Sequence, residues 1–256
     1  MEVTGAVAGV RAVLLDIDDT LVDTRGAFRH ALAVVGASHL PAAPDADALV
    51  AVWRTDSGGW YRAYTRGEVS YREQRMRRAN ELHERFGGAP LDDVAYDAWD
   101  EEFEAAFRDG WRAHEDAVTL VEALAEAGVP CGAVSNAAVA YQRHKLAAVG
   151  LEQVPMLVGT DTFGVGKPDP RVFLEGARLL GVEPTACMYV GDERDLDPVA
   201  ALAAGLGVGV WIDRPGTRHD GHPGSHAGAG DDAGHVWRVE TLTEVAAWFG
   251  PGATVR

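Results

Sequence analysis

Apolar runs that stop abruptly at polar residues recur along the chain and predict the strands of a buried sheet. Both faces of each run are apolar, which is typical of strands covered on two sides in a parallel sheet. The three clearest runs are residues 10–15, 129–134 and 186–190, and the polar residues that close them are Asp16, Ser135 and, after a glycine, Asp192. A further apolar run covers residues 208–212.

Segments with helical periodicity, each about ten residues long, lie between these runs. Four of them end at a glycine, the residue that most often closes a helix. The predicted helices are residues 117–127, 139–149, 171–180 and 198–204, with a last helix over 240–249. Strands that alternate with helices in this way predict an α/β fold, a Rossmann-like doubly wound parallel sheet with helices on both faces.

Residues 25–110 have a different character. They are polar, rich in arginine and aromatic residues, and show helical periodicity without a convincing strand, most clearly over 28–35, 71–86 and 92–107. We therefore expect a smaller all-helical cap domain over 25–110, inserted into a discontinuous core of residues 1–24 and 111–256. Within the core, residues 214–235 are so dense in Gly, His and Asp that we expect a mobile loop there.

The formal net charge of −16 limits the partners that the protein can have. Nucleic acid and anionic membranes attract clustered positive charge, so neither is an expected partner. A small anionic substrate is compatible, because it needs only a local cationic pocket or a bound metal. We find no leader-like segment at the start and no run of roughly 18 apolar residues, so a cytoplasmic location is expected. A monomer and a homodimer are both open.

Polar side chains follow the three clearest runs at what should be one edge of the sheet. In open parallel sheets, ligands collect beyond the carboxyl ends of the strands. Asp16 and Asp192 would repel each other there, each raising the other's pKa, unless a cation lies between them. Carboxylate oxygens without a nearby histidine or cysteine favour a hard ion, and Mg²⁺ is the expected one. Asp18 lies two residues beyond Asp16, so one carboxylate could attack while the other exchanges a proton.

These segments resemble the four motifs of the haloacid dehalogenase superfamily, in the family's order, from residue 10 to about residue 213. The matching residues are DIDDTL at 16–21, Ser135 after its apolar run, GKPDP at 166–170 followed by Phe173, and Gly191-Asp192 with Asp197 five residues further on. The place of the insert resembles the subclass with a helical cap after the first motif, the C1-type cap. The resemblance implies a Mg²⁺-dependent phosphatase that hydrolyses a small phosphorylated metabolite through an aspartyl-phosphate intermediate.

Three motif residues would carry the catalysis that the resemblance implies. Asp16 is expected to attack phosphorus, and Asp18 to protonate the leaving alcohol and then activate water. Lys167 is expected to hold the phosphoryl group and to screen the charge of the nucleophile. The other basic residues are almost all arginine, with Lys145 the only other lysine, which suggests that a compact charge is needed at Lys167.

The resemblance also implies which residues bind substrate and metal. The expected substrate-binding residues are Thr20, Ser135 and Asn136, and the expected Mg²⁺ ligands are Asp16, Asp192 and the backbone carbonyl of Asp18. Asp197 is expected to support the site beside Lys167. Simpler interpretations are open for three of these residues: Thr20 as a turn cap, Asn136 as a turn support and Asp197 as a helix-start carboxylate.

Related chemistries of the family differ in a few residues. Its dehalogenases lack the second aspartate of the first motif, which is present here as Asp18. Its phosphonate-cleaving members use a cap lysine, and residues 25–110 contain none. A sugar phosphomutase and a non-catalytic binding or regulatory module stay open as alternatives. The expected substrate is a nucleotide, a flavin precursor or a sugar phosphate, and cap residues such as Trp60 and Arg75 could either contact it or pack within the cap.

Overall fold

The computed structural model describes residues 7–41, 44–215 and 236–250, which divide into two compact units. Residues 7–22, 113–215 and 236–250 form the first, which we call the α/β unit, and residues 23–112 form the second, the helical unit. The loop predicted over 214–235 lies, from residue 216 on, outside the described residues.

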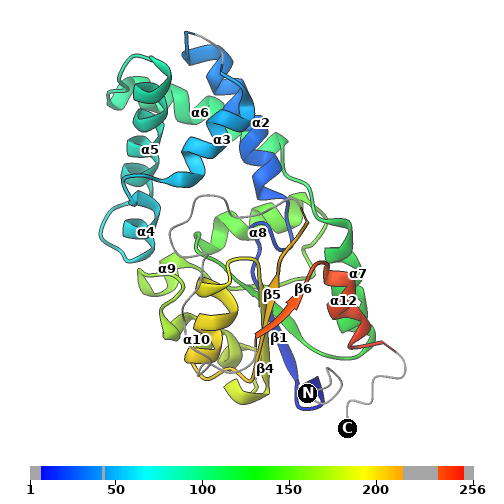
Figure 1. The fold of residues 1–256 in the computed structure, drawn as a ribbon. Helices are drawn as coiled ribbons and strands as arrows, with labels where there is room; N and C mark the ends of the chain where they lie inside the picture. Colours follow the sequence, from blue (N-terminus) through cyan, green and yellow to red (C-terminus); the bar gives the residue numbers. More distant parts are fainter. Residues whose placement is uncertain (1–6, 42–43, 216–235, 251–256) are drawn as a thin grey trace. The chain divides into compact units, whose positions relative to one another are not determined.

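A parallel sheet forms the centre of the α/β unit (Figure 1). In the described residues it has six strands in the order β3-β2-β1-β4-β5-β6. Their bounds are Ala12–Leu15 for β1, Cys131–Val134 for β2, Met156–Val158 for β3, Cys187–Gly191 for β4, Val208–Ile212 for β5 and Val236–Val239 for β6. The direction of winding reverses between β1 and β4, which is where doubly wound sheets bind their ligands. The predicted fold class is confirmed.

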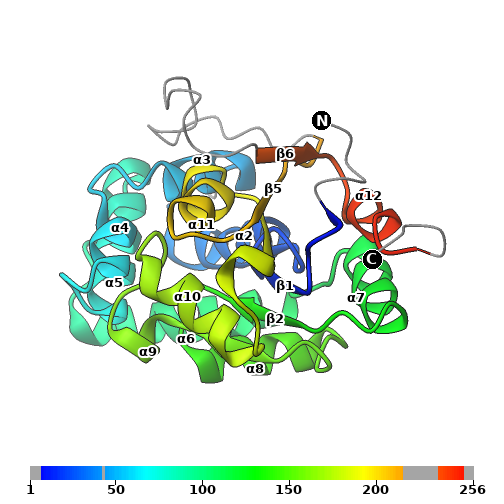
Figure 2. The ribbon, with the colours of Figure 1, turned by 90° about the horizontal axis from the view of Figure 1, so that it is seen from below.

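Helices cover both faces of this sheet, as the apolar character of its strands requires. On β1, Val13 and Leu15 face one core while Ala12 and Leu14 face the other. Figure 2 shows α7 and α12 together on one face and α10 and α11 on the other. Burying a valine or leucine side chain between the sheet and its helices stabilises the fold by about 1.5–3 kcal/mol.

The helices of this unit are α7 Glu115–Glu126, α8 Val139–Ala148, α9 Thr160–Phe163, α10 Pro170–Leu179, α11 Ala200–Ala203 and α12 Leu242–Ala247, with a 3₁₀ turn Pro184–Ala186 and a π-helical turn Asp195–Val199.

The helical unit contains, in its described residues, helices and no strand, as predicted. Its helices are α2 Thr24–His39, α3 Ala46–Thr55, α4 Trp60–Thr65, α5 Tyr71–Phe86 and α6 Asp93–Asp109. Aromatic rings pack in its core: Trp99 and Phe103 are stacked with ring centroids 5.0 Å apart, and Phe28 lies tilted 4.6 Å from Phe107. These rings join α2 to α6, and Trp53 brings α3 against them.

Arginines of α5 are bound inside the helical unit. The Arg75 side chain is only 5% exposed and forms an ion pair with Glu104 at 2.7 Å. Arg78 lies 4.1 Å above the Trp53 ring and donates a hydrogen bond to the Trp53 carbonyl. Because Arg75 and Arg78 are almost fully enclosed by their own unit, their primary role is packing and internal charge pairing.

The sequence pattern does not reveal two strands and three α-helices of the described residues. Strands β3 and β6 have three and four residues, and the short apolar run of β6 is interrupted by the exposed Arg238. The unpredicted helices are α3, α4 and α9, of which α4 and α9 have six and four residues. A helix predicted over 198–204 is a π-helical turn followed by α11, because Pro198 cannot donate a backbone hydrogen bond.

No helix among the described residues is both long and apolar enough to cross a membrane. Cys187 is buried in β4 and Cys131 is partly buried in β2, and both are free thiols.

Candidate active site

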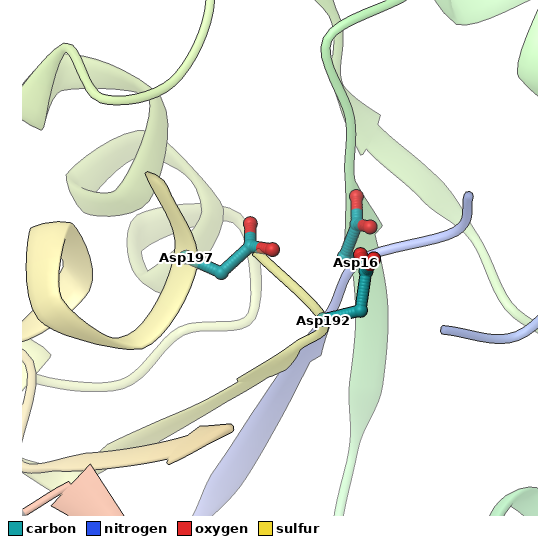
Figure 3. Close-up of side chains that lie close together, drawn as sticks. All are labelled: Asp16, Asp192 and Asp197. Atoms are coloured by element: carbon teal, nitrogen blue, oxygen red, sulfur yellow. The ribbon is translucent and has the colours of Figure 1, made fainter. Parts of the chain in front are cut away.

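Parallel pairing of β1 with β4 brings two aspartates to one point at the carboxyl edge of the sheet. Leu15 pairs with Val190, and the Asp16 amide donates a 2.9 Å hydrogen bond to the Val190 carbonyl. Asp16 and Asp192 therefore leave neighbouring strands side by side, at the position where the winding reverses. Figure 3 shows their carboxylates together, with Asp197 facing them from the turn that follows β4.

The carboxylates of Asp16, Asp192 and Asp197 form a buried acidic cluster. Each offers one oxygen within 4.8 Å of the other two. Burial raises the pKa of Asp192 well above its ordinary value, and the carboxylates of Asp19 and Asp16 raise it further. Burial also raises the pKa of Asp16, to about 8, against the opposing effect of Lys167. Such a cluster is stabilised by a bound cation, and its all-oxygen donor set fits a hard ion such as Mg²⁺.

Lys167 neutralises part of this acidic cluster from one side. Its ammonium donates three hydrogen bonds, to Asp16 Oδ1 at 2.6 Å, to Asp197 Oδ1 at 2.6 Å and to the Tyr189 hydroxyl at 3.0 Å. Burial alone would lower the pKa of Lys167, but the two carboxylates outweigh it and hold the pKa well above the ordinary value. Since an ammonium has three donors, Lys167 is a fully bonded, permanently charged group beside Asp16.

Asp197 is held by contacts other than a metal. Besides the bond from Lys167 to Oδ1, its Oδ2 accepts a 2.9 Å hydrogen bond from the Glu193 amide. A side chain at Gly191 would strike this carboxylate, because an ideal Cβ there lies 2.5 Å from Asp197 Cγ. With both of its oxygens engaged, Asp197 is better placed to support Lys167 than to bind an ion directly.

Asn136 fastens the loop that carries Lys167. Its amide nitrogen donates to the Lys167 carbonyl at 3.0 Å, and its oxygen accepts from the Lys167 amide at 2.5 Å. Both polar ends of this buried side chain are thus committed to one backbone position. This geometry favours the loop-supporting interpretation of Asn136 over direct substrate binding.

Ser135 and Thr20 lie next to the carboxylates. Ser135 follows β2, its amide bonds to the Val158 carbonyl of β3, and its hydroxyl accepts a 2.7 Å hydrogen bond from Gln142. The buried Thr20 hydroxyl is 3.5 Å from Asp16 Oδ2, the long limit of a hydrogen bond. The Thr20 hydroxyl therefore borders the nucleophile position that the sequence predicts for Asp16, and Ser135 lies at the end of the strand that pairs with β1.

Asp18 points toward helix α8. Two residues of this helix, neither of them predicted as a site residue, donate hydrogen bonds to its carboxylate. Lys145 Nζ donates to Asp18 Oδ1 and Gln142 Nε2 donates to Asp18 Oδ2, both at 2.6 Å. The one signal that points to Lys145 is composition, since it and Lys167 are the only lysines of the chain. Each of the two lysines is bound to one of the two aspartates that open the first motif.

Comparisons with known proteins agree with this geometry. A family model described as haloacid dehalogenase-like hydrolase matches residues 10–205. Over 94 residues, 36% of this chain and 40% of the relative, the chain is 36% identical to a glyceraldehyde 3-phosphate phosphatase of Methanopyrus kandleri. It is 28% identical to a phosphoserine phosphatase of Thermus thermophilus over 80% of this chain and 89% of that protein. The chain spans half the length or less of the first two curated relatives that it matches.

A solved structure extends the likeness to almost the whole chain. It is a family hydrolase of Deinococcus radiodurans with bound phosphate and sodium, 25% identical, with a TM-score of 0.66. The match covers 93% of this chain and 94% of that one. The fold of both units is therefore one that a phosphate-binding protein also adopts.

Proposed function

The chain belongs to the haloacid dehalogenase-like hydrolases, and from that premise we propose that it is a Mg²⁺-dependent phosphatase acting on a small phosphate monoester through a phosphorylated Asp16. One observation carries the proposal. Asp16 lies buried between Lys167 and Asp192, with a second carboxylate, Asp18, two residues further on. The named relatives support the substrate class, because glyceraldehyde 3-phosphate and phosphoserine are both small phosphate monoesters.

The proposed nucleophile is the Asp16 carboxylate. Lys167 binds its Oδ1 at 2.6 Å, while Oδ2 is approached at 3.5 Å by the Thr20 hydroxyl. We assign the attack on phosphorus to Oδ2, the less tightly bonded oxygen. The positive charge of Lys167 offsets the negative charge of Asp16 as the anionic phosphoryl group approaches. Charge neutralisation of this kind is the main requirement in phosphoryl transfer.

The other site residues bind the phosphoryl group and move protons. Ser135 presents a hydroxyl at the end of β2, where it can donate to a phosphoryl oxygen. Asp18 protonates the departing alcohol and later takes a proton from the water that hydrolyses the acyl phosphate. Asp16, Asp192 and the Asp18 carbonyl would hold Mg²⁺, which supplies charge neutralisation to the phosphoryl oxygens when bound.

The proposal is tested with 4-nitrophenyl phosphate and glycerol 2-phosphate in the presence of Mg²⁺. The wild-type chain should hydrolyse both, and excess chelator should stop the reaction. Asp16→Asn should lose turnover by several orders of magnitude while remaining folded, because an amide is a poor nucleophile. Mass spectrometry of acid-quenched wild-type protein should find phosphate on the peptide that contains Asp16.

A control variant removes a carboxylate of the same turn without touching the cluster. Asp195 is half exposed and pairs with Arg194, so Asp195→Asn should retain near wild-type turnover. Turnover that survives in Asp16→Asn, or that is indifferent to chelator, would contradict the proposed nucleophile or the metal.

A further inference from the structure

Both oxygens of the Asp18 carboxylate are bound by one face of helix α8. Lys145 Nζ takes Oδ1 and Gln142 Nε2 takes Oδ2, each at 2.6 Å. Gln142 and Lys145 are three residues apart, so they project from the same side of the helix. The Lys145 side chain is only 3% exposed, whereas the Asp18 side chain is 35% exposed. Two side chains from a buried helix face thus bind a carboxylate that is partly exposed to solvent.

The position of this helix face is itself fixed. Helix α8 begins at Val139, whose amide donates a 2.9 Å hydrogen bond to the Asp161 carboxylate. Three residues separate Ser135 from Val139, so a short connection joins the end of β2 to the start of α8. Any side chain anchored on α8 is therefore held in register with the strand end that carries Ser135.

Gln142 joins Asp18 to Ser135. Its amide nitrogen has two hydrogens, and one is donated to Asp18 Oδ2 while the other is donated to Ser135 Oγ at 2.7 Å. The opposite orientation of the amide would turn its oxygen toward the Asp18 carboxylate, which the negative charge disfavours. Since Ser135 Oγ accepts from Gln142, its own hydrogen is directed away from Gln142. That hydrogen is then available for an oxygen of a bound phosphoryl group.

We propose that Lys145 and Gln142 are positioning residues of the reaction: Lys145 fixes Asp18 for proton exchange, and Gln142 aligns Asp18 with the Ser135 hydroxyl. The inference rests on the proposed phosphatase function. Without these bonds the partly exposed Asp18 side chain would sample several rotamers, and only some would reach the oxygen of the leaving group. If Lys145 and Gln142 only tied α8 to the loop after β1, replacing them would change kcat/KM by the same factor for every leaving group.

The test compares leaving groups. 4-Nitrophenolate departs without a proton, whereas the alcohol of glycerol 2-phosphate needs one from Asp18. Lys145→Met should lower kcat/KM for glycerol 2-phosphate about 10–100-fold, part of the 10²–10⁴-fold contribution that general acid catalysis makes. It should lower kcat/KM for 4-nitrophenyl phosphate less than about threefold. Gln142→Leu should also lower kcat/KM more for glycerol 2-phosphate than for 4-nitrophenyl phosphate. It should in addition lower kcat/KM for both substrates, because Gln142 also acts through Ser135.

Controls separate positioning from folding. Arg143→Met removes a charge from the exposed side of the same helix and should leave both kcat/KM values unchanged. In an Asp18→Asn background, Lys145→Met should cause no further leaving-group preference. If Lys145→Met does not fold, as judged by its Tm, Lys145→Gln carries the test with a shorter, neutral donor.

The outcomes distinguish this inference from the function on which it rests. If the wild-type chain hydrolyses neither ester, the proposed function fails and the inference falls with it. If the wild type hydrolyses both but Lys145→Met lowers the two kcat/KM values equally, or lowers neither, the phosphatase stands and the positioning role is wrong. A selective loss on glycerol 2-phosphate supports it.

Discussion

At the scale of single residues, the candidate site is an arrangement of buried charges that compensate one another incompletely. Lys167 binds Asp16 and Asp197, but the Asp192 carboxylate lies against Asp16 with its pKa raised, chiefly by burial. Buried like charges cost stability unless a counter-charge is present. The described residues therefore have excess negative charge at the place where the proposal puts Mg²⁺.

Asp192→Asn should make the metal-free protein more stable and insensitive to Mg²⁺. The amide keeps the shape of the side chain and removes one of the crowded charges, so Tm without metal should rise by about 2–4 °C, equivalent to about 1 kcal/mol. Differential scanning fluorimetry with chelator and then with Mg²⁺ measures both effects. Wild type should gain Tm with Mg²⁺ and the variant should not, while Asp195→Asn should behave as wild type. An equal Mg²⁺ response in Asp192→Asn would remove Asp192 from the ligand set.

At the scale of secondary-structure elements, single polar side chains fix the ends of helices to the sheet. Asp116, in the first turn of α7, accepts hydrogen bonds from Arg214 at 2.8 and 2.9 Å and from the Leu242 amide at 2.8 Å. Arg214 also donates to the Thr20 carbonyl at 2.9 Å. The start of α12, the segment after β5 and the loop after β1 are thereby tied to α7.

Asp116→Asn should destabilise the protein by about 1.5–3 kcal/mol at neutral pH, the range for hydrogen bonds to a charged group. Burial favours the protonated acid, but the bonds from Arg214 and Leu242 outweigh it and lower the pKa of Asp116. A carboxylate with a lowered pKa in the folded state contributes its stability above the ordinary aspartate pKa and loses it as the pH falls further. The difference in free energy of unfolding between wild type and variant should thus be constant from pH 8 to about 5 and shrink below about 4.

Urea titrations at several pH values measure this difference. Asp47→Asn is a suitable control, because Asp47 is 71% exposed and an exposed ion pair such as the one with Arg29 contributes little to stability. A difference for Asp116→Asn that is independent of pH would show that the ionised carboxylate is not the stabilising form.

At the scale of the whole molecule, the chain has two cores of different composition. The α/β unit packs aliphatic strand residues against its helices, and the helical unit packs aromatic rings around Phe103. A unit with a core of its own can unfold as its own cooperative step. The chain has a net charge of −16, and arginines of the described residues such as Arg72 and Arg75 pair with acids of their own unit.

Phe103→Ala should separate the unfolding of the two units. The substitution removes a fully buried ring and should destabilise the helical unit by about 3–5 kcal/mol. Calorimetry should then resolve an early transition, followed by that of the α/β unit at nearly the wild-type temperature. Phe173→Ala, an equally buried ring in the α/β unit, should instead lower the later transition. One undivided transition in both variants would mean that the units unfold together.

Much of the fold and part of the site follow from local sequence. The apolar runs before Asp16, Ser135 and Asp192 mark β1, β2 and β4, because burial on both faces leaves a continuous apolar signal. Parallel strands place their carboxyl ends at one edge, so the order of elements puts Asp16 and Asp192 on the same edge, and the pairing of β1 with β4 makes them neighbours. The predicted helix over 71–86 coincides with α5, where Ser70 caps one end and Gly87 closes the other.

Only the tertiary structure decided which residues surround those strand ends. Gln142 and Lys145 read as ordinary polar positions of a helix, and nothing local shows that they meet Asp18, more than 120 residues away in the chain. Likewise the pattern around Arg75 does not tell an ion pair with Glu104 from a substrate contact. Periodicity and apolar runs report burial within one element, whereas the partner of a buried charge depends on how elements pack. The sequence by itself therefore determined strands β1, β2, β4 and β5 and the polar residues at their ends, and the packing of α8 determined what holds Asp18.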